Sequence, residues 1–183
     1  GRIDDRPQMQ RNTLFLNRGD LTFAQVAEYA GVHASGWSWS TLFMDVDLDG
    51  WEDILISTGH PWDLMDADSQ QRLRNRLVGV EWRKTRWEYP PLKLPNVAFR
   101  NRGDLTFEET GSRWGFDWVG VAQGIALGDL DNDGDLDVVV NNLNSGVSVY
   151  RNNSPAPRIS IRLKGKSPNT HGIGAKLKVL GGP

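Results

Sequence analysis

The chain contains one nine-residue stretch twice, as Asp45-Val46-Asp47-Leu48-Asp49-Gly50-Trp51-Glu52-Asp53 and as Asp129-Leu130-Asp131-Asn132-Asp133-Gly134-Asp135-Leu136-Asp137. Both copies carry Asp at positions 1, 3, 5 and 9 and Gly at position 6. Alternate residues of a tight loop can direct their oxygens to one centre, and Gly permits the bend that offers the backbone carbonyl of position 7. The spacing therefore predicts a cation-binding loop in each copy.

The donor atoms favour Ca²⁺, which takes six to eight oxygen ligands at about 2.3–2.6 Å. Mg²⁺ usually keeps several waters and fits less well, and Zn²⁺ prefers Cys and His, which neither loop contains. The alternative is that Asp and Gly simply make good turns. Four carboxylates within nine residues repel one another strongly without a cation, so we expect two Ca²⁺ per chain.

The residues after each loop argue against an EF-hand, which needs Glu at position 12 and flanking helices. Position 12 is Ile56 in the first copy and Val140 in the second. Each loop is followed by an apolar β-branched run, at 54–56 and at 138–140, which predicts a buried strand.

Composition narrows the protein class. With 183 residues, 38% of them hydrophobic and 24% charged, the chain has the make-up of a soluble globular protein. No apolar run approaches the roughly 18 residues of a membrane span, and Cys is absent, which excludes disulfides and thiol chemistry. A net charge of −2 gives no support to nucleic-acid binding.

A longer repeat surrounds the two loops. Residues 12–23 match residues 96–107, and both this match and the loop match have an offset of 84 (45 to 129). A four-stranded unit of this kind is the pattern of a propeller blade. The expected strands lie at 14–17, 22–26, 39–45 and 53–57 in the first unit and at 98–101, 106–109, 123–129 and 137–141 in the second.

A third copy starts at residues 147–152, with Tyr150 lying 51 residues after Phe99, so the first repeat contains an insertion of 33 residues, the difference between 84 and 51. Leu73, Leu77 and Val80 have helical spacing within it, with Asp66 or Asp68 as N-cap and Gly79 near the end. The insertion is locally basic, which favours a solvated helix face over a partner surface.

The chain beyond a Pro-containing linker at 154–157 alternates apolar and polar residues at 159–163 and 175–180, which predicts two strands of a half-buried sheet.

These motifs resemble a known family. Units with Leu-Phe-x-Asn-x-Gly-Asp-x-Thr-Phe followed by Asp-x-Asp-x-Asp-Gly-x-x-Asp look like FG-GAP/VCBS repeats. Residues 162–165 and 169–175 look like the opening of an ASPIC/UnbV domain, a pairing similar to bacterial relatives of cartilage acidic protein. The sequence departs from the repeat at Leu21 and Leu105, where Gly commonly precedes Thr-Phe.

The resemblance implies an all-β fold: a fragment of a β-propeller with two complete four-stranded blades and the start of a third, a C-terminal β-hairpin segment and one short helical insertion. It also implies Ca²⁺ in the blade loops, other blades of the parent propeller, and an extracellular, periplasmic or cell-surface location. Carried over by position, the metal ligands are Asp45, Asp47, Asp49, Trp51 (carbonyl) and Asp53 in the first loop, and Asp129, Asp131, Asp133, Asp135 (carbonyl) and Asp137 in the second.

The predicted organisation follows. It comprises a lead-in (1–11), a first FG-GAP/VCBS blade (12–59), an insertion with a short helix (60–95), a second blade (96–145), the first strand of the next blade with a linker (146–157), and the start of an ASPIC/UnbV domain (158–183).

Two function classes remain. The favoured one is a non-catalytic, calcium-stabilised binding or adhesion module with a protein or glycan ligand. The alternative is part of a carbohydrate-active propeller enzyme whose catalytic groups lie in inserts or missing blades. His60 is interpreted as a turn residue rather than a catalytic one, and Trp37, Trp39 and Trp118 as packing between blades rather than stacking on sugar rings.

Overall fold

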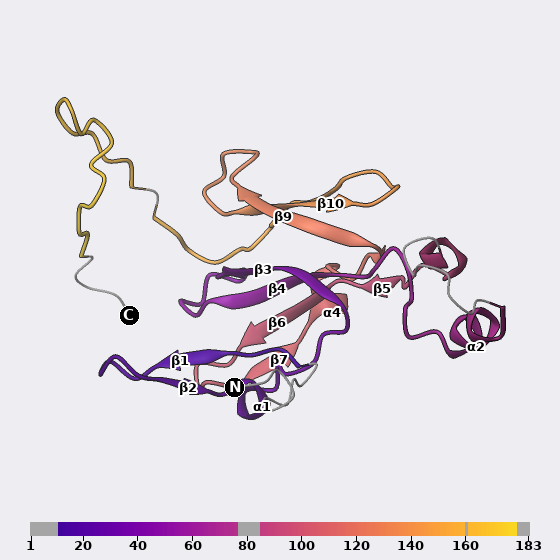
Figure 1. Ribbon diagram of the computed structural model, residues 1–183. Helices are drawn as coiled ribbons and strands as arrows, with labels where there is room; N and C mark the ends of the chain where they lie inside the picture. Colours follow the sequence, from indigo (N-terminus) through magenta and orange to yellow (C-terminus); the bar gives the residue numbers. More distant parts are fainter. Residues whose placement is uncertain (1–10, 77–84, 160, 179–183) are drawn as a thin grey trace.

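The computed structural model describes residues 11–76, 85–159 and 161–178, and these residues are mostly β-structure in small antiparallel sheets (Figure 1). Four sheets have the strand orders β1-β2, β3-β4-β6-β7, β11-β10-β9 and β5-β8. The strands are β1 (Phe15–Asn17), β2 (Phe23–Gln25), β3 (Ser38–Met44), β4 (Asp53–Thr58), β5 (Leu94–Pro95), β6 (Val97–Asn101), β7 (Phe107–Glu109), β8 (Val119–Gly120), β9 (Ala122–Gly128), β10 (Asp137–Asn142) and β11 (Ser148–Tyr150).

Each strand expected in the two repeats and in the third copy is present within a few residues of its expected place. Their assignment to sheets differs from the prediction. The four-stranded sheet joins β3 and β4 of the first repeat to β6 and β7 of the second, while β1 and β2 form a separate hairpin. The prediction that the four strands of each sequence repeat form one sheet was therefore wrong.

Strand pairing explains this difference. When the chain returns from the insertion, β6 runs antiparallel beside β4, with Ile54 opposite Phe99 and Ile56 opposite Val97. The free edge of β4 is thus satisfied by the following strand in the chain. One sheet consequently contains the second half of one repeat and the first half of the next.

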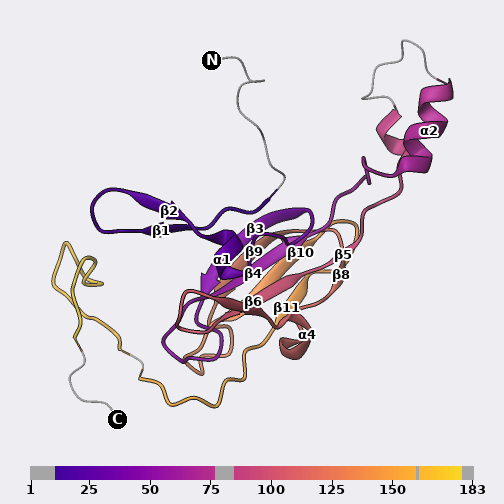
Figure 2. The ribbon, with the colours of Figure 1, turned by 90° about the horizontal axis from the view of Figure 1, so that it is seen from below.

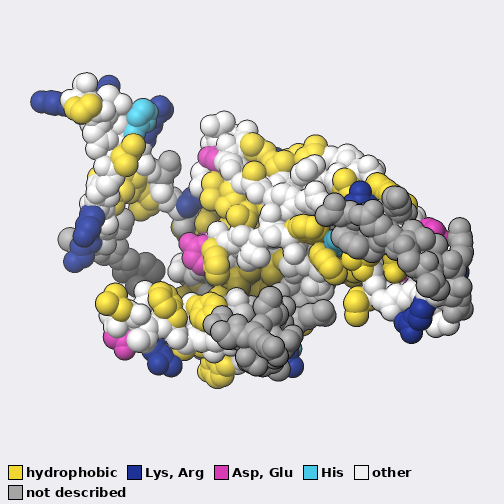
Figure 3. All heavy atoms as spheres, viewed as in Figure 1, with side chains coloured by type: hydrophobic (Ala, Val, Ile, Leu, Met, Phe, Trp, Pro, Cys, Tyr) yellow, Lys and Arg dark blue, Asp and Glu magenta, His cyan; other side chains and the backbone are white. Residues whose placement is uncertain are grey.

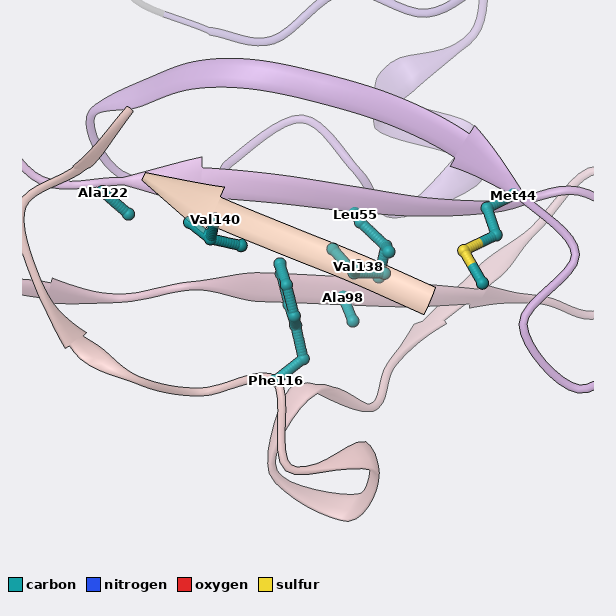
Figure 4. Packing of buried hydrophobic residues seen from close by; sticks show 7 residues of the cluster. All are labelled: Met44, Leu55, Ala98, Phe116, Ala122, Val138 and Val140. Atoms are coloured by element: carbon teal, nitrogen blue, oxygen red, sulfur yellow. The ribbon is translucent and has the colours of Figure 1, made fainter. Parts of the chain in front are cut away.

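The sheets stack, and alternate residues of a strand pack in opposite directions. Figure 1 shows β9 and β10 on one side of the four-stranded sheet and the β1-β2 hairpin with α1 on the other. Ile54 and Ile56 of β4 pack toward α1, whereas Leu55 packs with Val138 and Val140 of β10. Figure 4 shows this second cluster filling the space between sheets, which is what the period-two alternation of strands requires.

Two short helices follow the hairpins and were not predicted. They are α1 (Ala27–Ala30), after β2, and α4 (Gly111–Trp114), after β7. Gly31 and Gly115 end them in the left-handed conformation, with φ of +79° and +70°. These two glycines lie 84 residues apart, at equivalent positions of the repeat. Gly is favoured at both positions because it adopts the left-handed conformation without steric cost.

The insertion begins with an isolated bridge between His60 and Leu92, and β5 pairs with β8 where it ends. The predicted helix is present as α2 (Ala67–Arg76), and a short 3-10 helix, η2 (Arg86–Glu88), follows. Asp66 caps α2, because its Oδ1 accepts the amide of Ser69 at 2.7 Å. Leu73 is buried, while the predicted roles of Leu77, Gly79 and Val80 lie outside the described residues.

The C-terminal segment differs from the prediction of a β-hairpin. Its described residues, 159 and 161–178, contain no strand and extend away from the sheets (Figures 1 and 2). Ile159, Ile173 and Leu177 are 74%, 83% and 56% exposed. Alternating apolar residues form a stable sheet only against a surface that buries them, and these residues contact no such surface in the described structure.

Among the described residues, no helix is long and apolar enough to cross a bilayer.

Candidate metal centres

The two nine-residue loops connect β3 to β4 and β9 to β10, and they lie at the same end of the stacked sheets (Figure 1). We call residues 45–53 loop 1 and residues 129–137 loop 2. Acidic side chains gather along this edge of the surface in Figure 3.

Position 1 organises each loop through backbone amides. Asp45 accepts the amides of Asp49 and Gly50 at 3.0 and 2.9 Å, one on each carboxylate oxygen. Asp129 accepts the equivalent amides, those of positions 5 and 6, at 3.1 and 3.2 Å. Position 5 accepts the amide of position 7 in both loops, at 2.9 Å in loop 1 and 3.2 Å in loop 2.

The backbone of both loops needs unusual dihedral angles at two positions. Leu48 and Asn132, at position 4, have φ of +56° and +61°. Gly50 and Gly134, at position 6, have φ of +93° and +94°, a region in which a Cβ would be strained. The shared bends show why Gly is needed at position 6 of each loop.

Position 9 closes each loop from within the sheet. Asp53 is fully buried and accepts the amides of Val46 at 2.9 Å and Asn101 at 2.8 Å. Asp137, 1% exposed, accepts those of Leu130 at 2.8 Å and Asn152 at 2.9 Å. Each carboxylate thus joins the start of its loop to the end of the adjacent strand, β6 or β11, a role that spacing alone did not indicate.

Only part of each predicted ligand set comes together. Carboxylate oxygens of Asp45, Asp47 and Asp49 lie within 4.8 Å of one another, as do those of Asp129, Asp131 and Asp137. Asp53, Asp133 and Asp135 are outside these two groups, and the carbonyls of Trp51 and Asp135 stay predicted ligands. Oxygen atoms at such separations fit a hard cation with several oxygen ligands, whereas the described loops offer no nitrogen or sulfur donor.

Arginines that the sequence analysis did not assign contact both loops. Arg100 of β6 binds Asp47 through Nε at 2.5 Å and Asp49 through a terminal nitrogen at 2.6 Å. Arg151, at the matching position 51 residues later, lies 3.4 Å from Asp131, which is the residue equivalent to Asp47. The repeat of 51 residues could have identified this pair, because both arginines follow a matched strand.

The environment shifts the pKa of several loop carboxyls. The pKa of Asp53 is raised to about 6, and burial is the largest cause. Hydrogen bonds from the amides of Asn101 and Val46 lower this pKa, whereas the negative charges of Asp47 and Asp49 raise it further. Burial also raises the pKa of Asp135, whereas the Asp135 amide lowers the pKa of Asp133. A bound divalent cation would offset both the desolvation and the mutual repulsion.

His60 and the nearby tryptophans form a separate group at the base of the insertion. His60 is 8% exposed and its ring lies 4.2, 5.8 and 5.8 Å from the rings of Trp37, Trp39 and Trp62. The interpretation as a plain turn residue was therefore incomplete, because His60 packs in an aromatic cluster. Trp118 packs against the cluster between the sheets.

A model of the FG-GAP-like repeat matches residues 5–56 and 93–140, more than half of the chain. The two matched segments contain all of loop 1 and loop 2, and they end within β4 and β10, the strands that follow the loops. No curated protein matches the chain. The repeat match ends before residue 158, so the resemblance to an ASPIC/UnbV domain stays a prediction.

Proposed function

Because the chain belongs to the family of FG-GAP-like repeat proteins, we propose that it is part of a calcium-stabilised, non-catalytic β-propeller that binds a protein or glycan ligand outside the cytoplasm. The proposal includes one Ca²⁺ in each loop. Extracellular calcium modules work at weak affinity, with dissociation constants of about 10⁻⁴–10⁻³ M, which suits loops of exposed carboxylates.

The direction in which each sheet packs supports the propeller. Leu55 and Ala98 of the four-stranded sheet pack against the sheet that follows it in the chain. Their matched residues in the next sheet are Val139 and Val149, and Val149 is 58% exposed. The same face that is covered in one sheet is thus open in the next, as expected where a further sheet of the same kind packs.

The observation that carries the calcium proposal is the pair of oxygen clusters held by the same hydrogen bonds in both loops. Backbone amides pre-form each loop, so a cation need not order the chain when it binds. Oδ1 of Asp47 and Oδ1 of Asp135 are buried and have no hydrogen-bond partner among the residues that the structure describes, which leaves acceptor capacity in each loop.

Isothermal titration of the chain with Ca²⁺ tests the proposal, and we expect two sites per chain. The double variant Asp49→Ala and Asp133→Ala should bind no Ca²⁺, while Asp20→Ala, which removes a carboxylate from an exposed turn, should bind as the unsubstituted chain does. Absence of binding to the unsubstituted chain at millimolar Ca²⁺ would contradict the proposal.

A further inference from the structure

The segment from Arg151 to Arg158, which we call the strap, touches both loops. The amide of Asn152 donates to Asp137 of loop 2 at 2.9 Å, and its side-chain Nδ2 donates to the carbonyl of Val46 in loop 1 at 2.9 Å. Ser154 Oγ then donates to the carbonyl of Asp47 at 3.2 Å. The strap thus crosses from one sheet to the other along the edge that holds the loops.

Arg158 fastens the far end of the strap to loop 2. Its Nε donates to the carbonyl of Asp133 at 3.0 Å, one terminal nitrogen lies 3.2 Å from Asp133 Oδ2, and the other lies 2.8 Å from Asp135 Oδ2. That second nitrogen also donates to the carbonyl of Ser154 at 3.1 Å. One guanidinium therefore holds positions 5 and 7 of the loop and the strap together.

Loop 1 also pairs with an arginine, Arg100, but that residue belongs to strand β6 and contacts positions 3 and 5. Among the described residues, no arginine of a following strap contacts position 7 of loop 1. The residue 51 positions before Arg158 is Phe107, and position 7 of loop 1 is Trp51, where loop 2 has Asp135. The arginine of the strap and the carboxylate at position 7 thus occur together, at loop 2. The Asp135 side chain is fully buried and Arg158 is 26% exposed, so solvent screens their pairing less than it screens a surface ion pair.

A cation in loop 2 and the guanidinium of Arg158 compete for the same charge. Asp133 is a predicted ligand of the cation and already pairs with Arg158. Two positive groups a few ångströms apart repel each other, so a cation there weakens the hold of Arg158 on the loop. The two effects are linked. The factor by which a bound cation weakens the contact between Arg158 and the loop equals the factor by which that contact lowers the affinity for the cation.

We propose that Arg158 is a built-in counter-cation of loop 2, and that a divalent cation displaces it and frees the strap with the segment that follows. Metal binding at this loop then controls where the C-terminal segment lies. The proposal rests on the calcium proposal above. It assigns a specific difference between the loops, because binding at loop 1 leaves Arg158 in place.

Calcium affinity gives the first test. In an Asp49→Ala background, which leaves loop 2 as the remaining predicted site, Arg158→Gln should bind Ca²⁺ roughly tenfold more tightly in isothermal titration, because one repulsive charge is removed. Arg162→Gln is the matched control. It removes one charge from an exposed position just beyond the strap and should leave the dissociation constant unchanged. Arg158→Lys, which keeps the charge, should stay within about threefold of the parent.

Hydrogen exchange gives a second readout that does not depend on affinity. Peptides covering residues 151–159 should exchange faster with Ca²⁺ than with chelator in the parent chain and in Arg162→Gln. In Arg158→Gln they should exchange fast in both conditions.

The outcomes separate the two proposals. If neither the parent nor Arg158→Gln binds Ca²⁺, both proposals fail. If both bind but Arg158→Gln binds equally or more weakly, Arg158 positions the ligands and the counter-cation proposal alone is overturned. Slower exchange of residues 151–159 with Ca²⁺ would overturn it as well.

Discussion

Loop 1 and loop 2 share their backbone and differ in what surrounds it. Both use position 1 to accept the amides of positions 5 and 6, and both close through a buried Asp at position 9. At position 7 they diverge. A Cβ added to Gly103 would lie 3.0 Å from the Trp51 ring, so Trp51 covers the β6-β7 turn, whereas Asp135 pairs with Arg158 of the strap.

This comparison shows that the nine residues of each loop determine its backbone shape, whereas the residues around the loop determine which charged groups contact it. Loop 1 is covered by parts of its own sheet, β6 and the turn after it. Loop 2 lies in a sheet whose order ends at β11, and it is contacted by the strap that follows β11. The two sites are thus expected to bind the same ion with different consequences.

Removal of Ca²⁺ should produce the largest effect, because it acts on both loops. Binding to the folded state alone contributes about 2.7 kcal/mol per site when free Ca²⁺ is a hundredfold above its dissociation constant. For a chain of this size a chelator should then lower the melting temperature by roughly 10–20 °C, measured by calorimetry. An unchanged melting curve at neutral pH would mean that both loops are ordinary Asp-Gly turns.

Single substitutions should divide that effect between the loops. Asp49→Ala and Asp133→Ala each remove position 5 of one loop, so each should lower the melting temperature in excess Ca²⁺ by roughly 5–10 °C. Titration should show one site in place of two in either variant. Asp133→Ala also removes a partner of Arg158, so only this variant should speed exchange of the strap without Ca²⁺. Retention of two sites in either variant would contradict the ligand assignment.

Protons should compete with the ion at loop 1. Because burial raises the pKa of Asp53 to about 6, the metal-free folded state holds the proton of the Asp53 carboxyl group more tightly than the unfolded chain does. The contribution of Asp53 to the stability of the metal-free protein is therefore fully present below the unfolded pKa of 3.8 and is lost as the pH rises through about 6.

Calcium needs the ionised carboxylate, so its affinity for loop 1 should change in the opposite sense. In an Asp133→Ala background, the dissociation constant for Ca²⁺ should be about fourfold larger at pH 5.5 than at pH 7.5, measured by titration calorimetry. Asp53→Asn removes the titrating group and serves as the control. An equal affinity at both pH values in the Asp133→Ala protein would show that Asp53 does not contribute to binding.

The hairpin turns of the two units should give the smallest effect. Leu21 and Leu105 have φ of +69° and +70°, a conformation that costs a residue with a Cβ about 1–2 kcal/mol and costs Gly almost nothing. Leu21 is 96% exposed, so Leu21→Gly should raise the free energy of unfolding by about 1 kcal/mol. Leu105 is 51% exposed and loses some burial, so Leu105→Gly should gain less. Chemical denaturation of both variants measures the difference, and a loss of stability in Leu21→Gly would contradict the strain argument.

Features governed by neighbours along the chain could be predicted from the sequence. The Asp and Gly spacing set the loop shape through hydrogen bonds between positions 1, 5, 6 and 7. Apolar β-branched runs located the strand after each loop, and the departure from the repeat at Leu21 and Leu105 lies in turns that the structure holds at positive φ. These are local preferences of the backbone and side chains, so a short stretch of sequence contains them.

Features governed by residues far apart in the chain were decided only by the tertiary structure. Repetition identified β4 and β6 as strands but not as partners, because pairing depends on which strand edges meet after the insertion. Arg100 reaches loop 1 from the paired strand β6, 51 residues beyond Asp49, and Arg158 reaches loop 2 from the strap. At 159–163 and 175–178 the alternating pattern was the same as in true strands, but no described surface lies there to bury the apolar side chains, and burial is what makes such a pattern fold as a sheet.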